Sequence, residues 1–299
     1  MSGFSGGFAL VIGVSGYPCL PRLPLAVLND VVDIARVLWD PQICGYRPDR
    51  VRLLVEAEAT AEGIRGGIKW LAESCGSGDT AILYFSGHGW QGTGNSKREW
   101  YLAAYDASTD ACHDGMLPGS ELTELLSKIK AGRLAIVLDC CYAAGTAALK
   151  GGDMEELRPG LKQEDYERLA QGRGRVILAS SRSDEKSLVL EGDRNSLMTD
   201  CLLRGLTGAA GNESEVRALD LFRYVAKEVP ARSDHRQHPV LKCTLEDDFP
   251  LALRRCLATP NGPEESARLA AEPAASTSIS AGRDIVAIKR SGPVTINNR

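Results

Sequence analysis

The chain alternates short apolar runs with amphipathic stretches of helical period. The apolar runs predict strands at 8–14, 51–55, 80–85, 134–138 and 176–179. Apolar side chains at helical spacing predict helices over 24–39, 60–71, 117–129, 197–205 and 219–229. The first run is nearly continuous, as is typical of a central strand buried on both faces. This alternation favours an α/β fold, in which a mostly parallel sheet is flanked by helices on both faces.

The composition divides the chain into three parts. Residues 1–257 carry the alternating pattern and predict one globular domain, whereas residues 258–281 are rich in Pro, Ala, Ser and Gly and predict a flexible linker. Residues 282–299 form a short β-prone tail, which is a candidate docking segment for a regulatory protein partner. Inside the domain, residues 146–174 are polar and predict a long loop, and loops of that length are functional or disordered.

Charge and cysteine usage exclude several classes of protein. The formal net charge is -4 and no stretch concentrates Lys and Arg, so we expect no nucleic-acid partner. No apolar stretch approaches the ~20 residues that span a bilayer, and the N-terminus lacks a basic leader, so we expect a cytoplasmic protein with no membrane partner. The nine cysteines are odd in number and include no C-x-x-C pair, which predicts reduced thiols and neither a metal site nor a cofactor.

Two predicted strands end in residues that can carry chemistry. The strand at 80–85 runs into Ser86-Gly87-His88-Gly89, and the strand at 134–138 runs into Asp139-Cys140-Cys141. Adjacent parallel strands present their carboxyl ends at one edge of the sheet. A thiol beside an imidazole at that edge is the arrangement of a cysteine nucleophile and its base. A lone histidine or cysteine is more often structural, so the pair carries the prediction.

Together these motifs, with about 50 residues between His and Cys, resemble the caspase and metacaspase superfamily of cysteine peptidases, and within it the prokaryotic caspase-like branch. The resemblance covers about residues 7–256. Weaker similarities lie at Val11-Ile12-Gly13-Val14, Leu28-Asn29-Asp30-Val31, 101–107, 202–206 and Gln237-His238-Pro239-Val240. The family implies a caspase-haemoglobinase-like fold, cysteine endopeptidase activity on protein or peptide substrates, and a role in a bacterial signalling or defence pathway.

The resemblance also implies site residues. In the family's Asp-x-Cys pattern the second cysteine of the pair is the nucleophile, which is Cys141, and His88 takes its proton. Backbone N–H groups of Gly89 and Cys141 are expected to hold the oxyanion. Cys140 is the rival nucleophile and is expected to point into the core.

Four further residues are implied to bind substrate. In metacaspase-like enzymes, carboxylates that match Asp30 and Asp139 lie at the base of the S1 pocket, which favours a P1 Arg or Lys. The Gln-Ala-Cys-x-Gly signature of caspases that cut after Asp is absent. The segment 179–184 resembles the loop that lines this pocket, which adds Ser181 and Asp184 as candidates.

Three points stay open. The acidic cluster that binds calcium in many metacaspases is missing, and only the scattered Asp106, Asp110 and Asp114 remain. Two alternatives to a peptidase are a catalytically silent caspase-fold adaptor that binds a partner through the tail, and a redox sensor that uses Cys140 and Cys141. A peptidase of basic specificity could also cut itself in or beside the loop 146–174, at Lys150, Arg158, Lys162, Arg168, Arg173 or Arg175.

Overall fold

The computed structural model describes residues 7–94, 97–108, 114–142, 167–170, 174–182, 185–211, 215–253, 276–282, 285–289 and 292–297. The chain divides into two compact units, Met1–Arg254 and Arg255–Arg299. The first unit contains an eight-stranded sheet and a two-stranded sheet, and the second contains a three-stranded sheet.

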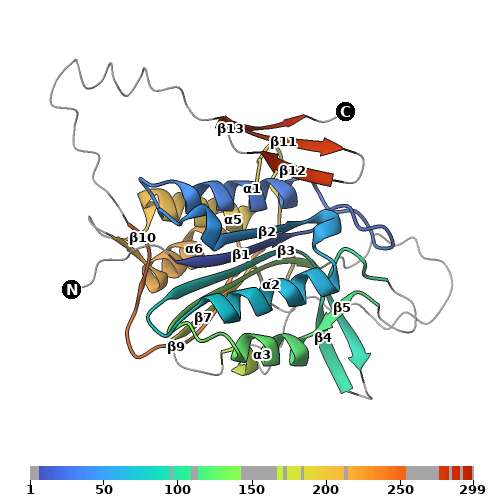
Figure 1. Ribbon diagram of the computed structural model, residues 1–299, viewed down its shortest axis with the longest axis horizontal. Helices are drawn as coiled ribbons and strands as arrows, with labels where there is room; N and C mark the ends of the chain where they lie inside the picture. Colours follow the sequence, from blue (N-terminus) through green and yellow to red (C-terminus); the bar gives the residue numbers. More distant parts are fainter. Residues whose placement is uncertain are drawn as a thin grey trace. The chain divides into compact units, whose positions relative to one another are not determined.

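The large sheet of the first unit has a parallel centre (Figure 1). Its main strands, in spatial order, are β2 (Val51–Val55), β1 (Phe8–Gly13), β3 (Thr80–Gly94), β6 (Arg133–Tyr142), β7 (Arg175–Ala179) and β9 (Val240–Thr244). The first five strands run parallel, and β9 pairs antiparallel with β7. Every described side chain of β1 after Phe8 is buried, as the continuous apolar run predicts.

Helices cover both faces of this sheet (Figure 1). On one face, α1 (Ala26–Trp39) contacts α5 (Leu197–Arg204), which in turn contacts α6 (Ala218–Arg232). On the other face, α2 (Ala61–Ser74) packs beside α3 (Gly119–Ser127). This arrangement confirms the predicted α/β fold with a mostly parallel sheet between two helical layers.

The starts of two helices follow ordinary capping chemistry. Thr60 precedes α2 and its side chain accepts the N–H of Gly63 at 3.1 Å. Ser196 precedes α5 in the same way and accepts the N–H of Thr199 at 3.4 Å. Both are hydroxyl N-caps, which satisfy an otherwise unpaired backbone donor of the first turn.

Helix α1 approaches β1 closely at a glycine. A Cβ atom added to Gly13 would lie 2.2 Å from Cγ2 of Val31, far inside van der Waals contact. Only a residue without a side chain lets α1 lie this near the sheet. The close approach brings the side of α1 that carries Asp30 against the strands.

Strands β3 and β6 continue beyond the ranges expected from the sequence. A hairpin that the periodicity did not predict explains the extension of β3, because β4 (Lys97–Ala103) pairs antiparallel with it from Gly89 to Gly94. Strand β5 (Met116–Pro118) then pairs with β4, so α3 begins at Gly119 rather than at 117. His88 and Cys141 therefore lie inside paired strands rather than in loops after them.

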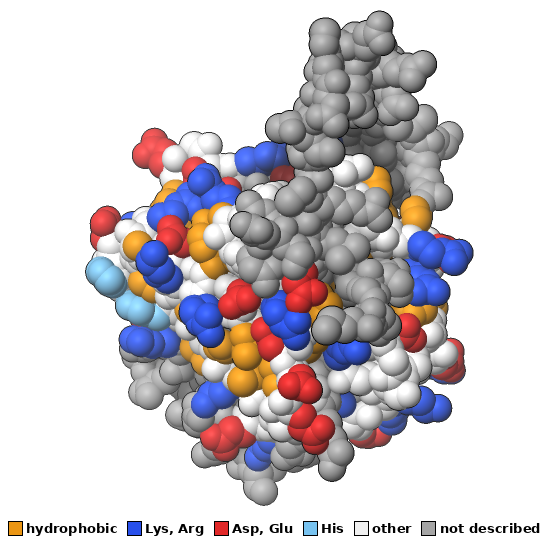
Figure 2. All heavy atoms as spheres, turned by 90° about the vertical axis from the view of Figure 1, so that its left-hand side faces the viewer, with side chains coloured by type: hydrophobic (Ala, Val, Ile, Leu, Met, Phe, Trp, Pro, Cys, Tyr) orange, Lys and Arg blue, Asp and Glu red, His pale blue; other side chains and the backbone are white. Residues whose placement is uncertain are grey.

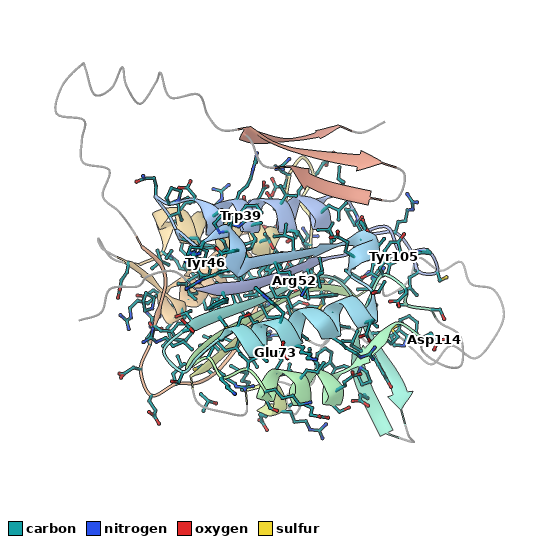
Figure 3. The ribbon with its side chains drawn as sticks, viewed as in Figure 1. Trp39, Tyr46, Arg52, Glu73, Tyr105 and Asp114 are labelled. Carbon is teal, nitrogen blue, oxygen red and sulfur yellow. The ribbon has the colours of Figure 1, made fainter. Side chains whose placement is uncertain are left out.

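The remaining elements of the first unit are short. Strands β8 (Glu215–Arg217) and β10 (Pro250–Leu253) form the two-stranded sheet. The short helical turns among the described residues include η1 (Pro48–Arg50), η2 (Glu56–Glu58) and η3 (Gly205–Ala209). Figure 3 shows which residues lie at each end of the parallel strands. Tyr105 and Asp114 lie toward the carboxyl ends of the strands, and Trp39 and Tyr46 lie toward their amino ends.

The second unit consists of β11 (Ser276–Gly282), β12 (Ile285–Lys289) and β13 (Gly292–Asn297). Strand β11 is central, antiparallel to β12 and parallel to β13. The β-prone tail thus forms strands, but β11 begins inside the range 258–281 that the sequence predicts as a linker. Pairing on both edges explains the strand, since β11 has neighbours on each side. The docking role of this tail stays a prediction.

Charged side chains of both signs are interspersed on the face of the molecule shown in Figure 2. Among the ion pairs of the described residues, several join neighbours in sequence, such as Arg204 with Asp200 at 2.7 Å and Arg223 with Asp220 at 3.1 Å. Exposed pairs of this kind contribute little to stability. No helix of the described residues is long and apolar enough to cross a membrane.

Candidate active site

Neighbouring strands bring the predicted catalytic positions together. Strands β3 and β6 pair in parallel register, which places His88 opposite Cys141 and Ser86 opposite Asp139. Paired residues of adjacent strands lie about 5 Å apart in the hydrogen-bonding direction. Because side chains alternate along a strand, Ser86 shares a face of the sheet with His88, and Asp139 shares it with Cys141.

His88 is held by the loop between β1 and α1. The side chain is 2% exposed, and its backbone N–H donates to Oη of Tyr17 at 2.8 Å. The Tyr17 and His88 rings are tilted against each other with centroids 4.7 Å apart. Nε2 of His88 lies 2.7 Å from the carbonyl oxygen of Pro21. A carbonyl oxygen only accepts, so Nε2 carries the hydrogen, and Nδ1 is the nitrogen of the neutral ring that can take a proton.

The two adjacent cysteines lie on opposite faces of β6. Cys140 is 3% exposed and belongs to the apolar core between the sheet and the α2 and α3 layer. Alternation along a strand predicts that Cys141 belongs to the other face, which is the face of Asp139. The structure describes the backbone of Cys141 but not its side chain. The burial of Cys140 agrees with its predicted place in the core.

Asp139 is buried and accepts three hydroxyl donors. Ser187 donates to Oδ1 at 2.7 Å, while Ser196 and Thr199 both donate to Oδ2, the latter at 2.8 Å. Thr199 also lies 2.7 Å from the hydroxyl of Tyr84. The carboxyl group is therefore fixed by the segment before α5 and by the first turn of that helix.

Asp30 lies beside Asp139 and is connected to it through Ser196. The backbone N–H of Ser196 donates to Oδ1 of Asp30 at 2.9 Å, while its hydroxyl donates to Asp139. Ser86 donates to Oδ2 of Asp30 at 3.4 Å. Burial, followed by the nearby charge of Asp139, raises the pKa of Asp30 from 3.8 to about 8. Two buried carboxyl groups thus share one site: Asp139 lies two residues before Cys141 on β6, and Asp30 reaches it from α1.

The remaining predicted site residues are Gly89, Ser181 and Asp184. Gly89 lies in β3 opposite Leu102 of β4 and Tyr142 of β6. Ser181 follows β7 and is buried, and its hydroxyl donates to the carbonyl of Glu185 at 3.2 Å. Asp184 lies outside the described residues.

Sequence reasoning did not find several residues of this site. Ser86 could have been found, because a strand of period two puts it on the face of His88. The hydroxyls on Asp139 come from residues far away in sequence, and the carbonyl of Pro21 has no side-chain signature. The missed residues are Tyr17, Pro21, Ser86, Ser187, Ser196 and Thr199.

Two predictions concern other segments. Most of the loop 146–174, with the expected cleavage positions other than Arg168 and Arg175, lies outside the described residues. Of the scattered acids, Asp110 also lies outside, while Asp106 accepts the N–H of Ala61 at 2.8 Å at the start of α2. Within the described ranges, no group of three or more His, Cys, Asp or Glu side chains is placed to hold a metal ion.

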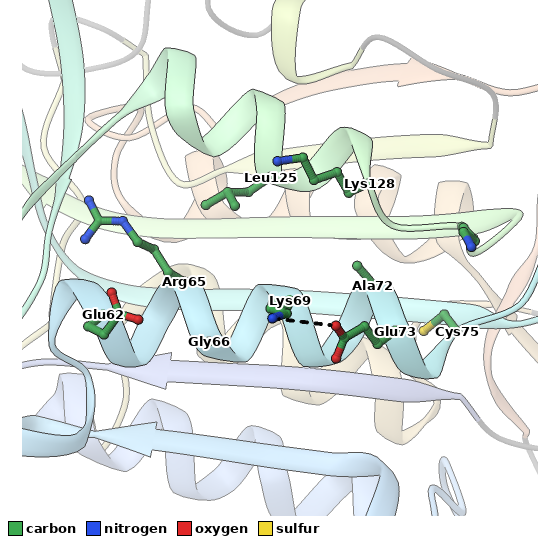
Figure 4. Close-up of a pocket in the computed structure, with 10 residues that line it drawn as sticks. Glu62, Arg65, Gly66, Lys69, Ala72, Glu73, Cys75, Leu125 and Lys128 are labelled. Carbon is green, nitrogen blue, oxygen red and sulfur yellow. Dashed lines mark ion pairs between the residues drawn. The ribbon is translucent and has the colours of Figure 1, made fainter.

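A cavity of about 640 Å³ lies between α2 and α3 (Figure 4). It is on the opposite face of the sheet from Asp30. Four basic side chains line it, and three of them pair with acids: Lys69 with Glu73 at 3.8 Å, Arg65 with Glu121 at 2.6 Å and Lys128 with Glu124 at 2.8 Å; the fourth is Lys130. The cavity does not belong to the site described above.

Comparison with known proteins identifies the family. A model of the caspase domain matches residues 6–250. The chain belongs to the caspase-domain family. Its first unit is thus a caspase-family cysteine peptidase domain, which confirms the resemblance noted in the sequence.

One curated relative and one solved structure are similar to this caspase-domain protein. Metacaspase-4 of Arabidopsis thaliana is 24% identical over 143 residues, which are 46% of this chain and 33% of the relative. The match therefore spans about one third of that protein's length. The crystal structure of a Geobacter sulfurreducens protein has a TM-score of 0.56 at 19% identity, over 81% of this chain and 95% of that one. The similarity to the Geobacter sulfurreducens structure shows that the two chains share a fold.

Proposed function

We propose that this caspase-domain protein is a cysteine endopeptidase with a Cys141–His88 dyad, and that it cleaves proteins after Arg or Lys. The observation that carries the proposal is the parallel register of β3 and β6. It puts His88 opposite Cys141 and, two residues earlier on the same faces, Ser86 opposite Asp139. Asp30 joins this group through Ser196. A nucleophile, a base and a carboxylate pair thus lie along one edge of the sheet.

The chemistry follows from the orientation of His88. With Nε2–H held by the Pro21 carbonyl, Nδ1 takes the proton of the Cys141 thiol, and the thiolate attacks the scissile carbonyl carbon. N–H groups of Gly89 and Cys141 stabilise the oxyanion. His88 then protonates the leaving amine, and the same nitrogen removes a proton from the water that hydrolyses the acyl-enzyme.

Asp30 and Asp139 together bind the basic side chain of the P1 residue. A carboxylate offers about four acceptor positions. Asp139 uses three of them on hydroxyls, and Asp30 accepts the Ser196 N–H and the Ser86 hydroxyl. Each carboxyl group therefore keeps acceptor capacity for a P1 guanidinium or ammonium, and the two together supply the negative charge. A P1 aspartate would place a third carboxylate beside two buried ones, which is strongly unfavourable.

The test uses matched fluorogenic peptides that differ only at P1: Arg, Lys, Asp and citrulline. Citrulline has nearly the shape of Arg without its charge, so it separates charge recognition from fit. We expect cleavage of the Arg and Lys peptides, and little or none of the citrulline and Asp peptides. Cleavage of the Asp peptide at the rate of the Arg peptide would refute the pocket assignment.

Covalent labelling separates the peptidase from the two alternative functions. A peptide with P1 Arg and an electrophilic group should add once to the wild-type chain and to Cys140→Ala, but not to Cys141→Ala. A silent adaptor would not be labelled by this peptide. If Cys140 and Cys141 formed a redox pair, the chain would lose its response to oxidants in both Cys140→Ala and Cys141→Ala. The bacterial signalling or defence role stays a prediction that this test does not address.

A further inference from the structure

The loop between β1 and α1 acts as a support for His88. It supplies both the Tyr17 hydroxyl and the Pro21 carbonyl that contact the histidine. The loop is closed at its base, where the N–H of Leu23 donates to the carbonyl of Ser15 at 2.9 Å. The hydroxyl of Ser15 donates back to the carbonyl of Leu23, also at 2.9 Å. Ser15 and Leu23 therefore hold the two ends of the loop together, and the Tyr17 hydroxyl anchors its middle by donating to the carbonyl of Ala103 at 3.1 Å.

Glu56 holds the base of this loop from the neighbouring strand. It is the residue after β2, and β2 pairs with β1 so that Val55 lies opposite Gly13. The two carboxylate oxygens of Glu56 each lie 3.1 Å from the backbone N of Gly16, and one lies 3.4 Å from that of Ser15. Hydrogen bonds from N–H groups to a carboxylate are among the stronger ones in proteins.

The backbone of Glu56 adopts a conformation that needs support from its surroundings. Its φ is 50°, in the left-handed region that a non-glycine residue rarely occupies. Such a residue persists only where neighbouring contacts fix it, and these positions concentrate at functional sites. Its carbonyl accepts the N–H of Ala59 at 2.7 Å, which closes the turn. Burial raises the pKa of Glu56, while the Gly16 and Ser15 N–H groups and the charge of Arg22 oppose that shift.

We propose that Glu56 is a positioning residue for His88: it fixes Ser15 and Gly16, and through them the loop whose Pro21 carbonyl orients the imidazole. The inference rests on the proposed function, because orientation of His88 matters for the reaction of Cys141. No atom of Glu56 is assigned a contact with the substrate. Asp30 and Asp139 make none of these loop contacts, so the binding of a P1 side chain is independent of Glu56.

The kinetic test compares Glu56→Ala, Glu56→Gln and the control Glu58→Ala in the full chain. Glu58 is an exposed acid of the same turn. For the P1 Arg peptide we expect Glu56→Ala to lower kcat by about 10- to 100-fold and to leave KM within about twofold. Glu56→Gln should recover part of kcat, because its amide oxygen still accepts the Gly16 N–H. A Glu56→Ala enzyme with wild-type kcat, or with a loss equal to that of Glu58→Ala, would overturn the inference.

A second measurement reports on His88 without relying on turnover. In 15N spectra of the histidine rings, the wild type should show His88 as the Nε2–H tautomer, assigned by comparison with His88→Gln. Glu56→Ala should shift this signal toward a mixture of tautomers. If no peptide is cut by the wild type but the signal shifts, the proposed function fails and the positioning role stands. An unchanged signal in Glu56→Ala would refute the positioning role.

Should Glu56→Ala fail to fold, Ser15→Ala gives the same test from the other side of the contact. This variant removes only the hydroxyl that donates to Leu23. We expect a smaller loss of kcat, unchanged KM and a partial shift of the His88 signal. Wild-type kcat and an unchanged signal in both Ser15→Ala and Glu56→Gln would contradict the proposal.

Discussion

Replacing Asp30 by asparagine isolates the contribution of this buried carboxyl group to the pH dependence of stability. In the folded chain its pKa is raised from 3.8 to about 8, chiefly by burial. A group whose folded pKa is raised binds its proton more tightly in the folded state. Its contribution to the free energy of unfolding is therefore complete below pH 3.8, falls as the pH rises, and is lost above about pH 8.

The size of the effect follows from the shift. One pKa unit corresponds to about 1.4 kcal/mol, so the whole interval corresponds to about 6 kcal/mol. Between pH 5 and pH 7, the wild type should lose about 3 kcal/mol relative to Asp30→Asn. The variant has no titrating group at this position, so the difference between the two chains removes the pH effects that they share.

The assay is urea unfolding followed by tryptophan fluorescence at pH 5, 6 and 7. Ser86→Ala is the matched control, because it removes a donor to Asp30 but keeps the titrating group, and it should preserve the wild-type slope. Asp139→Asn should reduce the slope without abolishing it, since burial is the larger cause of the shift. A difference between wild type and Asp30→Asn that stays constant from pH 5 to pH 7 would refute the reasoning.

Three further predictions concern activity and packing. Cys141→Ala should abolish cleavage of the P1 Arg peptide while Cys140→Ala, a core position, retains most of it; equal losses in two folded variants would contradict the assignment. For the same peptide, KM of the wild type should fall between pH 6 and pH 8, because a bound cation favours ionised Asp30; an equal fall in Asp30→Asn would show another cause. Gly13→Ala should lower the free energy of unfolding by about 1–3 kcal/mol, because the new Cβ would lie 2.2 Å from Val31. Adding Val31→Ala should restore part of that loss in chemical denaturation.

Periodicity alone predicted the strands that matter most for the site. The apolar runs before His88 and Cys141 indicated neighbouring buried strands, and the observed register places the two residues opposite each other. The difference between Cys140 and Cys141 also follows from alternation along a strand. What periodicity missed was the hairpin of β3 and β4, because residues 86–94 are polar and rich in glycine. Their strand conformation comes from pairing rather than from local preference.

The hydroxyl groups that donate to Asp139 could not be predicted from the sequence, for a different reason. Ser187, Ser196 and Thr199 reach Asp139 from positions 48 to 60 residues later in the chain. Serine and threonine are common before and within the first turn of a helix, so nothing local distinguishes Ser196 and Thr199 from ordinary residues of a helix start. Ser187 lies in an irregular segment, where a serine is equally ordinary. Pro21 acts through its backbone carbonyl, and that role depends on where the loop lies rather than on a residue type.

The hydroxyl donors to Asp139 come after it in the sequence, and this order matters while the protein is being synthesised. Strands β3 and β6 leave the ribosome before residues 187–199, so a nascent chain holds both members of the proposed dyad before it holds the groups that fix Asp139. Until that segment docks, Asp139 lacks all three of its hydroxyl donors and Asp30 lacks the Ser196 N–H. Under the proposed function, the nascent chain therefore holds the dyad before the carboxyl groups that would recognise P1 are fixed, and we expect selective cleavage only after α5 has packed on the sheet.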